Sequence, residues 1–584
     1  MRHMTNLVAH RGPDGIGLHI DSFCALGHRH LAIIDTSQAG FRQPMSYRGR
    51  YWITYNGAVY NYVELRAELE TLGATFATRT DTEVILAAYA HWGADCLRRF
   101  NGMWAFVIYD SQERTLLIAR DRFGVRPLYY LEDAEQFAIG SEIKQLLPLL
   151  PKVRVNQDML AESLLIHFGG HTEDTYFAGI KSLPAAHYFH YSLATHTYTR
   201  HRYYDLAAND AYRALSFDAA VATFKELFTD AVRVRLRSAV PIGAALSGGL
   251  DSSTTCAVAG SICNGHRLMT FHAKSTEQGS DESDYAQACA SRLGLPLVVV
   301  EPSTEDFKRT IDEVVYTQEE PFGGPSMFMG WHVFREARAR NIRVMLSGQG
   351  GDETLLGYDR YYAAILHQTS GMTFLRQLLL QARHSSLTRL GVLEYYLYFT
   401  RPGLRLRRLK SRSYLKPEIV DSLAFAPVEQ SAASFRNVDE LSKIEIESLQ
   451  LPRLLRYDDR NAMRHAIETR MPFLDYRLVE LAVSLPADYK IHDGWRKYVL
   501  RKAFGDQLPP EITWQRTKIG FEAPDNTWLA AHGDAIKREI ESSAILEKIT
   551  DKARLLRDFA SLSVKEQWAY FNAAAWERVY NVSC

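Results

Sequence analysis

Hydrophobic positions in the first 205 residues recur in short runs that are separated by polar turns. The segments 104–110 and 115–119 are two such runs, rich in aliphatic and aromatic residues, and this pattern is typical of hairpin strands. Two stretches have helical spacing instead: 63–72, and a second that begins at Asp81, where we expect the N-cap. Together these elements predict an α+β arrangement of antiparallel sheets covered by helices.

The pattern changes after about residue 205, where predicted strands alternate with predicted helices. Such alternation indicates a parallel, doubly wound α/β sheet. The remainder from about residue 359 is predicted to be mostly helical, and we expect a domain boundary between 1–205 and 206–584. The expected strands cover 241–246, 268–273, 296–300 and 343–346, with helices near 285–293 and 328–340.

Composition narrows the class of protein. The 584 residues hold 68 Lys and Arg against 68 Asp and Glu, so the formal charge is zero, whereas a nucleic-acid binder needs surplus positive charge. No apolar run approaches the ~18 residues that span a bilayer, and residues 1–14 lack the apolar stretch of a signal peptide. None of the six cysteines has CxxC spacing. We therefore expect a cytoplasmic, multidomain protein with no nucleic-acid, membrane or zinc partner.

The segment 246–253, Leu-Ser-Gly-Gly-Leu-Asp-Ser-Ser, carries the clearest chemistry. It joins a predicted strand to a predicted helix, where glycines let backbone N–H groups approach an anion and the helix N-terminus adds partial positive charge. No lysine follows the glycines, so this is not a Walker A loop. Asp251 would face phosphate oxygens only through a divalent cation, for which Mg²⁺ is the natural choice. The alternative interpretation is an ordinary glycine turn at a helix start.

A second loop, 346–353, repeats this chemistry as Leu-Ser-Gly-Gln-Gly-Gly-Asp-Glu after a later strand. Ligands of open α/β sheets bind at the carboxyl ends of parallel strands, so we expect the two loops to lie together, with Asp251 and Asp352 as metal ligands. The first loop resembles the pyrophosphate loop of the ATP-pyrophosphatase superfamily. Members of that superfamily cleave ATP between its α and β phosphates and form an adenylate.

With both loops in place, the C-terminal part resembles the synthetase domain of the glutamine-dependent asparagine synthetase family. The segments 459–463, 467–475 and 516–521 add to this match, and the N-terminal part resembles the same family's glutaminase domain. The resemblance implies an Ntn-hydrolase-like αββα sandwich followed by an ATP-pyrophosphatase sheet, and relatives suggest a homodimer. The glutaminase match rests on segments 10–15, 31–35, 55–57, 100–106 and 120–124.

The family resemblance implies a reaction. The aspartate side-chain carboxylate attacks the α-phosphorus of ATP to give β-aspartyl-AMP and pyrophosphate, and ammonia then displaces AMP. Lys518 matches the family lysine that stabilises the departing pyrophosphate. Arg516 and Lys497 are weaker candidates for the same task, and for each we favour the alternative interpretation of a solvated or helix-capping cation. The family's ATP-contact positions fall on Leu246, Ala273, Ser347 and Gly348. The loop chemistry adds Ser247, Gly248, Gly249, Asp251, Ser252 and Asp352 as expected ATP contacts.

One position of the second loop departs from the family. The residue after Gly348 is a glutamate in well-studied members and a proposed base for ammonia addition, but here it is Gln349, which cannot accept a proton. We take Glu468 as the substitute candidate. The alternative for Glu468 is a buried structural ion pair.

The start of the chain also departs from the family. Family glutaminases begin Met-Cys-Gly-Ile and use the exposed cysteine as nucleophile, whereas this sequence begins Met-Arg-His-Met, and Cys24 is predicted to be a buried structural thiol. Either the start is clipped or called too late, or the glutaminase is lost.

The implied glutamine pocket is eroded as well. Asn56 and Gly57 match the oxyanion hole, and Asp81 matches a glutamine-binding carboxylate. However, two positions differ. His30 replaces the family arginine that binds the glutamine carboxylate, and Ala58 replaces the family glutamate that follows Asn-Gly. Two lost hydrogen bonds to charged groups would cost roughly 3–6 kcal/mol, so we favour an impaired glutaminase.

Three functions remain in competition. The first is asparagine synthesis from ATP, aspartate and either glutamine or ammonia. The second is a specialised amide or peptide ligase on the same scaffold, like the β-lactam synthetases, which Gln349 and the eroded pocket favour. The third is a non-catalytic nucleotide sensor, which the retained Asp251, Asp352 and Lys518 disfavour.

Overall fold

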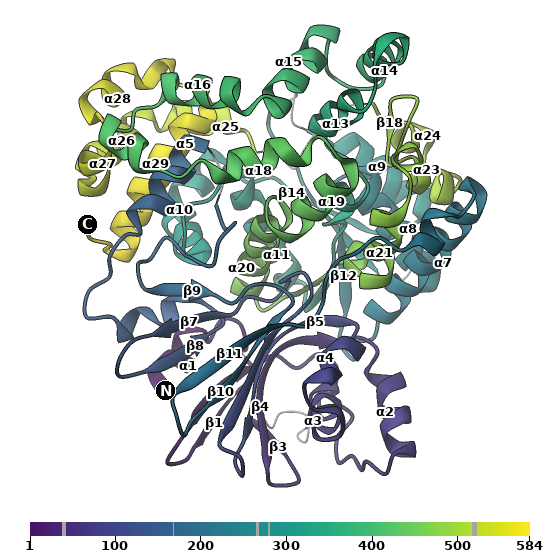
Figure 1. Cartoon of the computed structure of the whole chain (residues 1–584), viewed down its shortest axis with the longest axis vertical. Coiled ribbons are helices and arrows are strands. Elements are labelled where there is room, and N and C mark those ends of the chain that lie inside the picture. Colours follow the sequence, from purple (N-terminus) through teal and green to yellow (C-terminus); the bar gives the residue numbers. More distant parts are fainter. Residues whose placement is uncertain (38–42, 167–168, 264–267, 278–280, 517–522) are drawn as a thin grey trace.

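The computed structural model describes the chain except residues 38–42, 167–168, 264–267, 278–280 and 517–522. Antiparallel sheets from the N-terminal part form the lower portion of the molecule in Figure 1, and helices from the C-terminal part crowd the upper portion. Within the described residues, no helix combines the length and the apolar character needed to cross a membrane.

The N-terminal part is built on a six-stranded antiparallel sheet whose two faces are both buried. Along β5, Trp104, Phe106 and Ile108 pack with the helices α2 (Tyr62–Thr71) and α3 (Asp81–Trp92). The residues between them face a second layer of strands, as the two-residue period of a strand requires. The sheet order is β11 (Thr197–Arg202), β10 (His187–Ser192), β6 (Thr115–Arg120), β5 (Gly102–Asp110), β4 (Tyr51–Val59) and β3 (Met45–Tyr47).

The second layer contains a hairpin and a small sheet. The hairpin pairs β1 (Gly15–Ile20) with β2 (Ala25–His30), and the three-stranded sheet has the order β8 (Phe137–Gly140), β7 (Tyr129–Glu132), β9 (Ile180–Ser182). These layers confirm the predicted α+β arrangement. The N-cap of α3 is Thr80, whose hydroxyl accepts from the Glu83 amide, so the N-cap prediction for Asp81 is wrong by one residue.

The C-terminal part contains a five-stranded parallel sheet, which confirms the predicted doubly wound architecture. After β12, the strands β13 and β14 are added on one side of it, and β15 and β16 are then added on its other side. The direction in which strands are added therefore reverses between β12 and β15, which makes this pair the switch point of the sheet. Four strands were predicted; the fifth, β16, was not, because Glu-Thr-Arg has no hydrophobic run. The order is β14 (Leu297–Val300), β13 (Met269–Ala273), β12 (Ile242–Ala245), β15 (Val344–Leu346) and β16 (Glu468–Arg470).

Helices cover this sheet and form most of the remaining chain, as predicted. Those that position the site are α8 (Leu250–Ile262), α20 (Leu451–Arg464) and α23 (Tyr498–Phe504). The largest hydrophobic core joins the N-terminal α5 (Gln157–Ile166) to the C-terminal helix α29 (Val564–Tyr580). The two parts therefore share one core.

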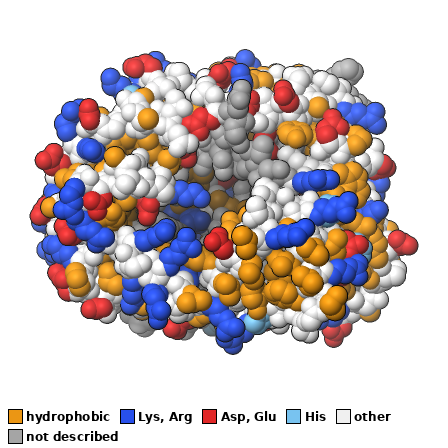
Figure 2. Space-filling model, turned by 90° about the horizontal axis from the view of Figure 1, so that it is seen from above, with side chains coloured by type: hydrophobic (Ala, Val, Ile, Leu, Met, Phe, Trp, Pro, Cys, Tyr) orange, Lys and Arg blue, Asp and Glu red, His pale blue; other side chains and the backbone are white. Residues whose placement is uncertain are grey.

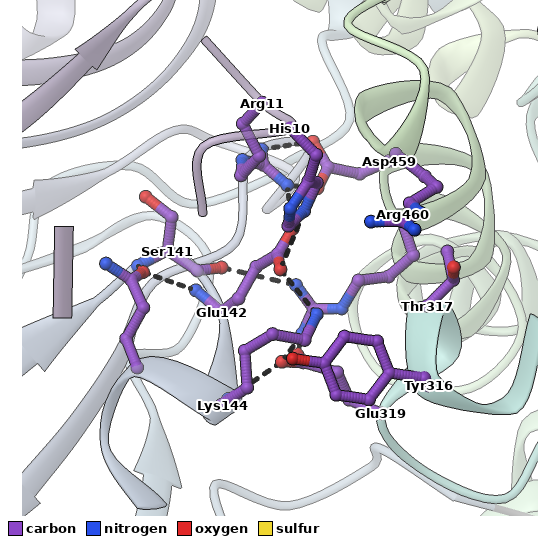
Figure 3. Close-up of polar contacts among 12 residues, drawn as sticks. His10, Arg11, Ser141, Glu142, Lys144, Tyr316, Thr317, Glu319, Asp459 and Arg460 are labelled. Atoms are coloured by element: carbon purple, nitrogen blue, oxygen red, sulfur yellow. Dashed lines mark hydrogen bonds and ion pairs between the residues drawn. The ribbon is translucent and has the colours of Figure 1, made fainter. Parts of the chain in front are cut away.

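Buried ion pairs also join the two parts (Figure 3). Arg11 hydrogen-bonds both Asp459 oxygens, at 2.8 and 3.1 Å, and also donates to Glu142 at 2.9 Å. Arg460, on the same helix as Asp459, pairs with Glu319 at 2.5 Å and donates to the Ser141 carbonyl. Removing both charges from water costs free energy, so a buried ion pair adds little net stability. Removing one partner is nevertheless destabilising, because it leaves the other charge buried and uncompensated.

Candidate active site

The two glycine-rich loops meet at the switch point of the parallel sheet. β12 and β15 are direct neighbours, with Ala244 opposite Leu346, so the segments that follow them emerge side by side. Hydroxyls close the first loop on itself, because Ser252 Oγ accepts from the Ser247 amide at 3.1 Å and lies 2.9 Å from Ser247 Oγ. The loop then runs into the N-terminus of α8, where backbone N–H groups favour an anion.

Glycines let the second loop lie directly against Asp251. A Cβ placed on Gly348 would lie 2.7 Å from the Ser252 amide nitrogen, and one on Gly351 would lie 2.7 Å from Asp251 Cγ. Both distances are shorter than real Cβ contacts allow. The small residues of the second loop therefore define how closely the two carboxylate-bearing turns approach.

Lys497 joins the two carboxylates. Its ammonium donates a hydrogen bond to Asp251 Oδ2 and forms a 2.6 Å ion pair with Asp352 Oδ1. Burial lowers the pKa of Lys497, but Asp251 and Asp352 outweigh it and raise the pKa above its ordinary value, so the ammonium stays charged. A Cβ on Gly357 would come within 2.1 Å of Lys497 Cε, so this glycine makes room for the lysine. Lys497 is therefore buried rather than solvated, and it occupies the N-cap position of α23 without a side-chain capping hydrogen bond.

These groups line a cavity of about 420 Å³. Arg496, Lys497 and Arg501 contribute positive charge to its lining, which also includes the apolar side chains of Phe271 and Phe334. A concave site that combines apolar walls with a few charged groups is the usual form of a small-molecule site. Of the predicted ATP contacts, its lining includes Leu246, Ser247, Gly249, Asp251, Ser252, Ser347, Gly348 and Asp352.

Asp458 on α20 is a cavity residue that the sequence analysis missed. It lines the cavity together with Leu454 and Asn461, at the i, i+4, i+7 spacing of one helix face. Burial, the largest cause, raises the pKa of Asp458 to about 6; the Asp459 charge acts in the same direction, and the Thr469 hydrogen bond and Arg126 oppose it. Asp458 Oδ2 is buried and has no hydrogen-bond partner among the described residues.

The sequence contained a signal for Asp458. Consecutive helical residues point about 100° apart, so the pair Asp458–Asp459 had to present its carboxylates to different surroundings. Asp459 faces Arg11 and Arg126, whereas Asp458 faces the cavity.

The structure places two of the three predicted catalytic residues, Gln349 and Glu468, in different cavities. Gln349 lines the cavity, and Lys518 lies outside the described residues. Glu468 lies elsewhere: its carboxylate pairs with Arg470 at 2.8 Å and with Arg126 at 3.1 Å, and it lines a second cavity in the N-terminal part. These ion pairs match the alternative interpretation and remove the geometric basis for Glu468 as a base. Ala273 and Gly248 are also absent from the described lining of the nucleotide cavity.

The second cavity, of about 740 Å³, is lined by all five predicted glutamine-binding residues, namely His30, Asn56, Gly57, Ala58 and Asp81. Asn56 Nδ2 is buried and has no hydrogen-bond partner among the described residues, which leaves it able to donate to a ligand. Asp81 accepts from the Tyr55 hydroxyl at 2.8 Å and from the Val59 amide at 3.0 Å. Burial raises the pKa of Asp81 to about 6.

His30, at the position where a cation is expected to hold the glutamine carboxylate, carries no charge, although Arg11, Arg29 and Arg126 also line this cavity. Burial lowers the pKa of His30 below its ordinary value, although Asp14 and Asp35 oppose it, so His30 is neutral at pH 7. Burial also raises the pKa of the Cys24 thiol to about 12, so its nucleophilic thiolate is suppressed.

Comparisons with known proteins agree with this arrangement. A family model described as "Asparagine synthase" matches residues 223–580, and one described as "Glutamine amidotransferase domain" matches residues 1–204. The chain is 30% identical over 551 residues to asparagine synthetase [glutamine-hydrolyzing] 1 of Bacillus subtilis, covering 91% of this chain and 84% of that one.

Two further relatives show the breadth of the match. A putative asparagine synthetase [glutamine-hydrolyzing] of Mycobacterium tuberculosis is 31% identical over 561 residues, with coverage of 90% and 84%. Amidase chry2 of Gibberella zeae is 26% identical over 578 residues, again with coverage of 90% and 84%.

The fold and the site together define an amidotransferase-type sandwich joined to an ATP-pyrophosphatase-type sheet. More particularly, the chain belongs to the asparagine synthase (glutamine-hydrolysing) family of enzymes. Membership in this family implies the use of ATP.

Proposed function

We propose that this enzyme adenylates the side-chain carboxylate of aspartate with ATP and transfers the acyl group to ammonia, giving asparagine, AMP and pyrophosphate. The observation that carries the proposal is the cluster of Asp251, Lys497 and Asp352 where β12 and β15 end. A buried cation between two carboxylates, beside a helix N-terminus, suits a departing diphosphate with its metal ion.

The donor set fits Mg²⁺. The described residues contain no cluster of three or more His, Cys, Asp and Glu side chains able to hold a metal. Mg²⁺ commonly uses one or two protein carboxylates and completes its shell with phosphate oxygens and water, and Asp251 and Asp352 would supply the protein share. When bound, the ion neutralises phosphate charge.

In the first step, the acceptor carboxylate oxygen attacks the α-phosphorus, and the bond between that phosphorus and the bridging oxygen to the β-phosphate breaks. Pyrophosphate leaves with the electron pair. The Lys497 ammonium can stabilise the negative charge that develops on the departing pyrophosphate, because the raised pKa of Lys497 keeps it protonated. Lys518 stays a proposed partner in this role on the strength of the family resemblance.

In the second step, ammonia attacks the acyl carbon, and the bond from that carbon to the AMP oxygen breaks. One N–H proton must leave for the neutral amide to form. We propose that the Asp458 carboxylate accepts this proton as a general base. Asp458 lines the same cavity as Gln349, and its pKa of about 6 lies close to neutral pH. Thr469, which hydrogen-bonds Asp458, pairs in register with Met345 of β15, the strand that leads into the Gln349 loop.

We propose free ammonia as the preferred nitrogen donor. Neutral His30 and the apolar Ala58 replace two groups that would hold glutamine by charge. Asn56, whose side-chain amide matches the family's oxyanion hole, is retained. We therefore expect weakened glutamine binding and not the loss of the whole cavity.

A second candidate function is amide formation on an acid other than aspartate. Gln349 favours it, since the altered position lies in the cavity that would hold the acceptor. A relative named as an amidase points in the same direction.

One assay separates these possibilities. The protein is incubated with ATP, Mg²⁺ and aspartate, together with ammonium or glutamine, and pyrophosphate, AMP and asparagine are measured. We expect asparagine with ammonium and little with glutamine. Equal turnover with glutamine would contradict the donor assignment, and no aspartate-dependent pyrophosphate would favour the second candidate.

A further inference from the structure

Three consecutive helices on the upper face in Figure 1 expose an unusual number of apolar side chains. They are α14 (Gly371–Arg383), α15 (Arg389–Thr400) and α16 (Pro402–Arg412), each packed against the next. Of the sixteen large hydrophobic side chains exposed in the described residues, seven come from this segment. They are Met372, Leu375, Leu379, Leu390, Tyr395, Leu397 and Leu404.

The exposed apolar residues form stripes. Met372, Leu375 and Leu379 follow the i, i+3, i+7 spacing of a single helix face, and Leu390 and Leu397 follow i, i+7 on α15. Met372 is 80% exposed and Leu390 is 75% exposed. Helices normally turn such stripes toward a core, so a face that shows them to solvent is expected to meet an apolar phase.

The same segment concentrates positive charge. Residues 371–412 contain nine Lys and Arg but one acid, Glu394, a net charge of +8 in a chain whose total is zero. Arg376 pairs with Asp493, and Arg405 is buried. The remaining seven, all exposed and without an ion pair among the described residues, are Arg383, Arg389, Arg401, Arg407, Arg408, Lys410 and Arg412.

Figure 2 looks down on this face and shows orange apolar side chains gathered beside blue Lys and Arg side chains. The two cavities described above take no lining residue from 371–412. The apolar tips of Met372 and Leu390 protrude, and a protein partner would need matching pockets for them. A lipid surface deforms around such tips, while its anionic headgroups receive the arginines.

We propose that α14, α15 and α16 form a docking face for an anionic membrane surface. The enzyme lies on the bilayer there, with the aliphatic tips in the headgroup region and the seven exposed cations near lipid phosphates. The expectation of no membrane partner rested on the lack of a spanning segment, which does not bear on peripheral binding.

The test is flotation of the full chain with vesicles of phosphatidylcholine in which about a third of the lipid is phosphatidylglycerol. We expect binding to these vesicles, little binding to pure phosphatidylcholine, and loss of binding as NaCl is raised. The double variant R407Q/R408Q should weaken binding roughly thirtyfold, the factor that two surface charges supply. The variant M372S/L390S should weaken it at least about tenfold through lost apolar insertion.

Matched controls lie outside the three helices. Ile20→Ser removes an aliphatic side chain that is 63% exposed on β1, and R292Q/K308Q removes two exposed charges from α9 (Ser283–Leu293) and α10 (Thr304–Gln318). Both controls should bind vesicles like the parent chain. Equal binding by all variants, or no binding to anionic vesicles, would overturn the proposal. So would a dimer that sedimentation detects and that M372S/L390S dissociates, because the face would then join two copies.

Discussion

Asp458 and Asp459 show how one helical step separates two chemical roles. Asp459 turns toward Arg11 and Arg126; burial opposes ionisation, but the two arginines keep its pKa below the ordinary value. Asp458 turns toward the nucleotide cavity, where burial raises its pKa to about 6. The first carboxylate is therefore fixed in its charged form, and the second can exchange a proton near neutral pH.

Replacing Asp458 by asparagine should impair amide formation while sparing adenylation. Pyrophosphate–ATP exchange with aspartate should stay near the parent rate, and asparagine formation from ammonium should fall by about a hundredfold, the usual scale for a lost general base. In the parent enzyme, amide formation at a fixed concentration of free ammonia should rise as pH increases through about 6, since Asp458 accepts a proton only when ionised. This limb should vanish in the variant.

A second substitution sharpens that experiment. Gln349 lines the same cavity as Asp458, so Gln349→Glu in the Asp458→Asn background should restore part of the amide formation. A variant Asp458→Asn with a normal amide rate and an unchanged pH profile would remove Asp458 from the mechanism.

The second prediction at the residue scale concerns His30 and glutamine binding. Because its imidazole is neutral at pH 7, His30→Arg should restore a charged hydrogen bond to the glutamine carboxylate, worth about 1.5–3 kcal/mol. Calorimetric titration should show glutamine binding roughly ten- to a hundredfold tighter. His190→Arg on β10 is the exposed control and should leave glutamine affinity unchanged. A tight parent affinity that His30→Arg lowers would mean that His30 already holds glutamine well.

Contacts between individual residues of the site were the part that the sequence predicted least well. The loop motifs identified Asp251 and Asp352 because glycine-rich turns after strands are local features of the sequence. Lys497 reaches them from a residue 246 positions away from Asp251, and only the fold brings it there. The ion pair of Glu468 with Arg126 was hidden for the same reason, since Arg126 comes from the other part of the chain.

At the element scale, the site depends on two turns that touch. Strands with hydrophobic runs were predictable, and so was a parallel sheet that contains β12 and β15. The ligand-binding rule for open sheets placed both loops at carboxyl ends of parallel strands, whereas the direct pairing of β12 with β15 is seen only in the structure. The short polar strand β16 has no hydrophobic pattern of its own, and its place was set by pairing with β15.

The contact between the turns can be tested with a single methyl group. Gly348→Ala would place a Cβ 2.7 Å from the Ser252 amide nitrogen, and the turns must move apart to relieve the overlap. Displacement of about 1 Å in a reacting site can cost a hundredfold in rate, so we expect aspartate-dependent exchange to fall by about that factor. Gly533→Ala, where no atom lies within 4 Å, is the control. Parent-like exchange in Gly348→Ala would show that the close approach is unnecessary.

At the scale of the whole molecule, the two parts are held together by a shared core and by buried charge. Asp459 is a centre of this contact, because it pairs with Arg11 at 2.8 Å and with Arg126 at 2.8 Å. Both arginines come from the N-terminal part, and Arg126 also reaches Glu468. The layered fold of each part was predictable from its sequence, whereas this network depends on how the parts dock.

Asp459→Asn should destabilise the molecule by about 3–5 kcal/mol, because two buried arginines lose a charged partner. The pKa of Asp459 is lowered in the folded state, so its stabilising effect is present above the unfolded pKa of about 4 and is lost as pH falls toward the folded value. Thermal unfolding at a series of pH values should show a shallower acid limb in the variant. An unchanged melting temperature at neutral pH would contradict the role of this network.

The central claim is that Asp251, Asp352 and Lys497 hold pyrophosphate while a carboxylate becomes an acyl-AMP. Exchange of labelled pyrophosphate into ATP, measured with and without aspartate and Mg²⁺, tests it most directly. The account predicts exchange that requires both, and a loss on the order of a hundredfold or more in Asp352→Asn and in Lys497→Gln. Exchange that persists at the parent rate in either variant would contradict the claim.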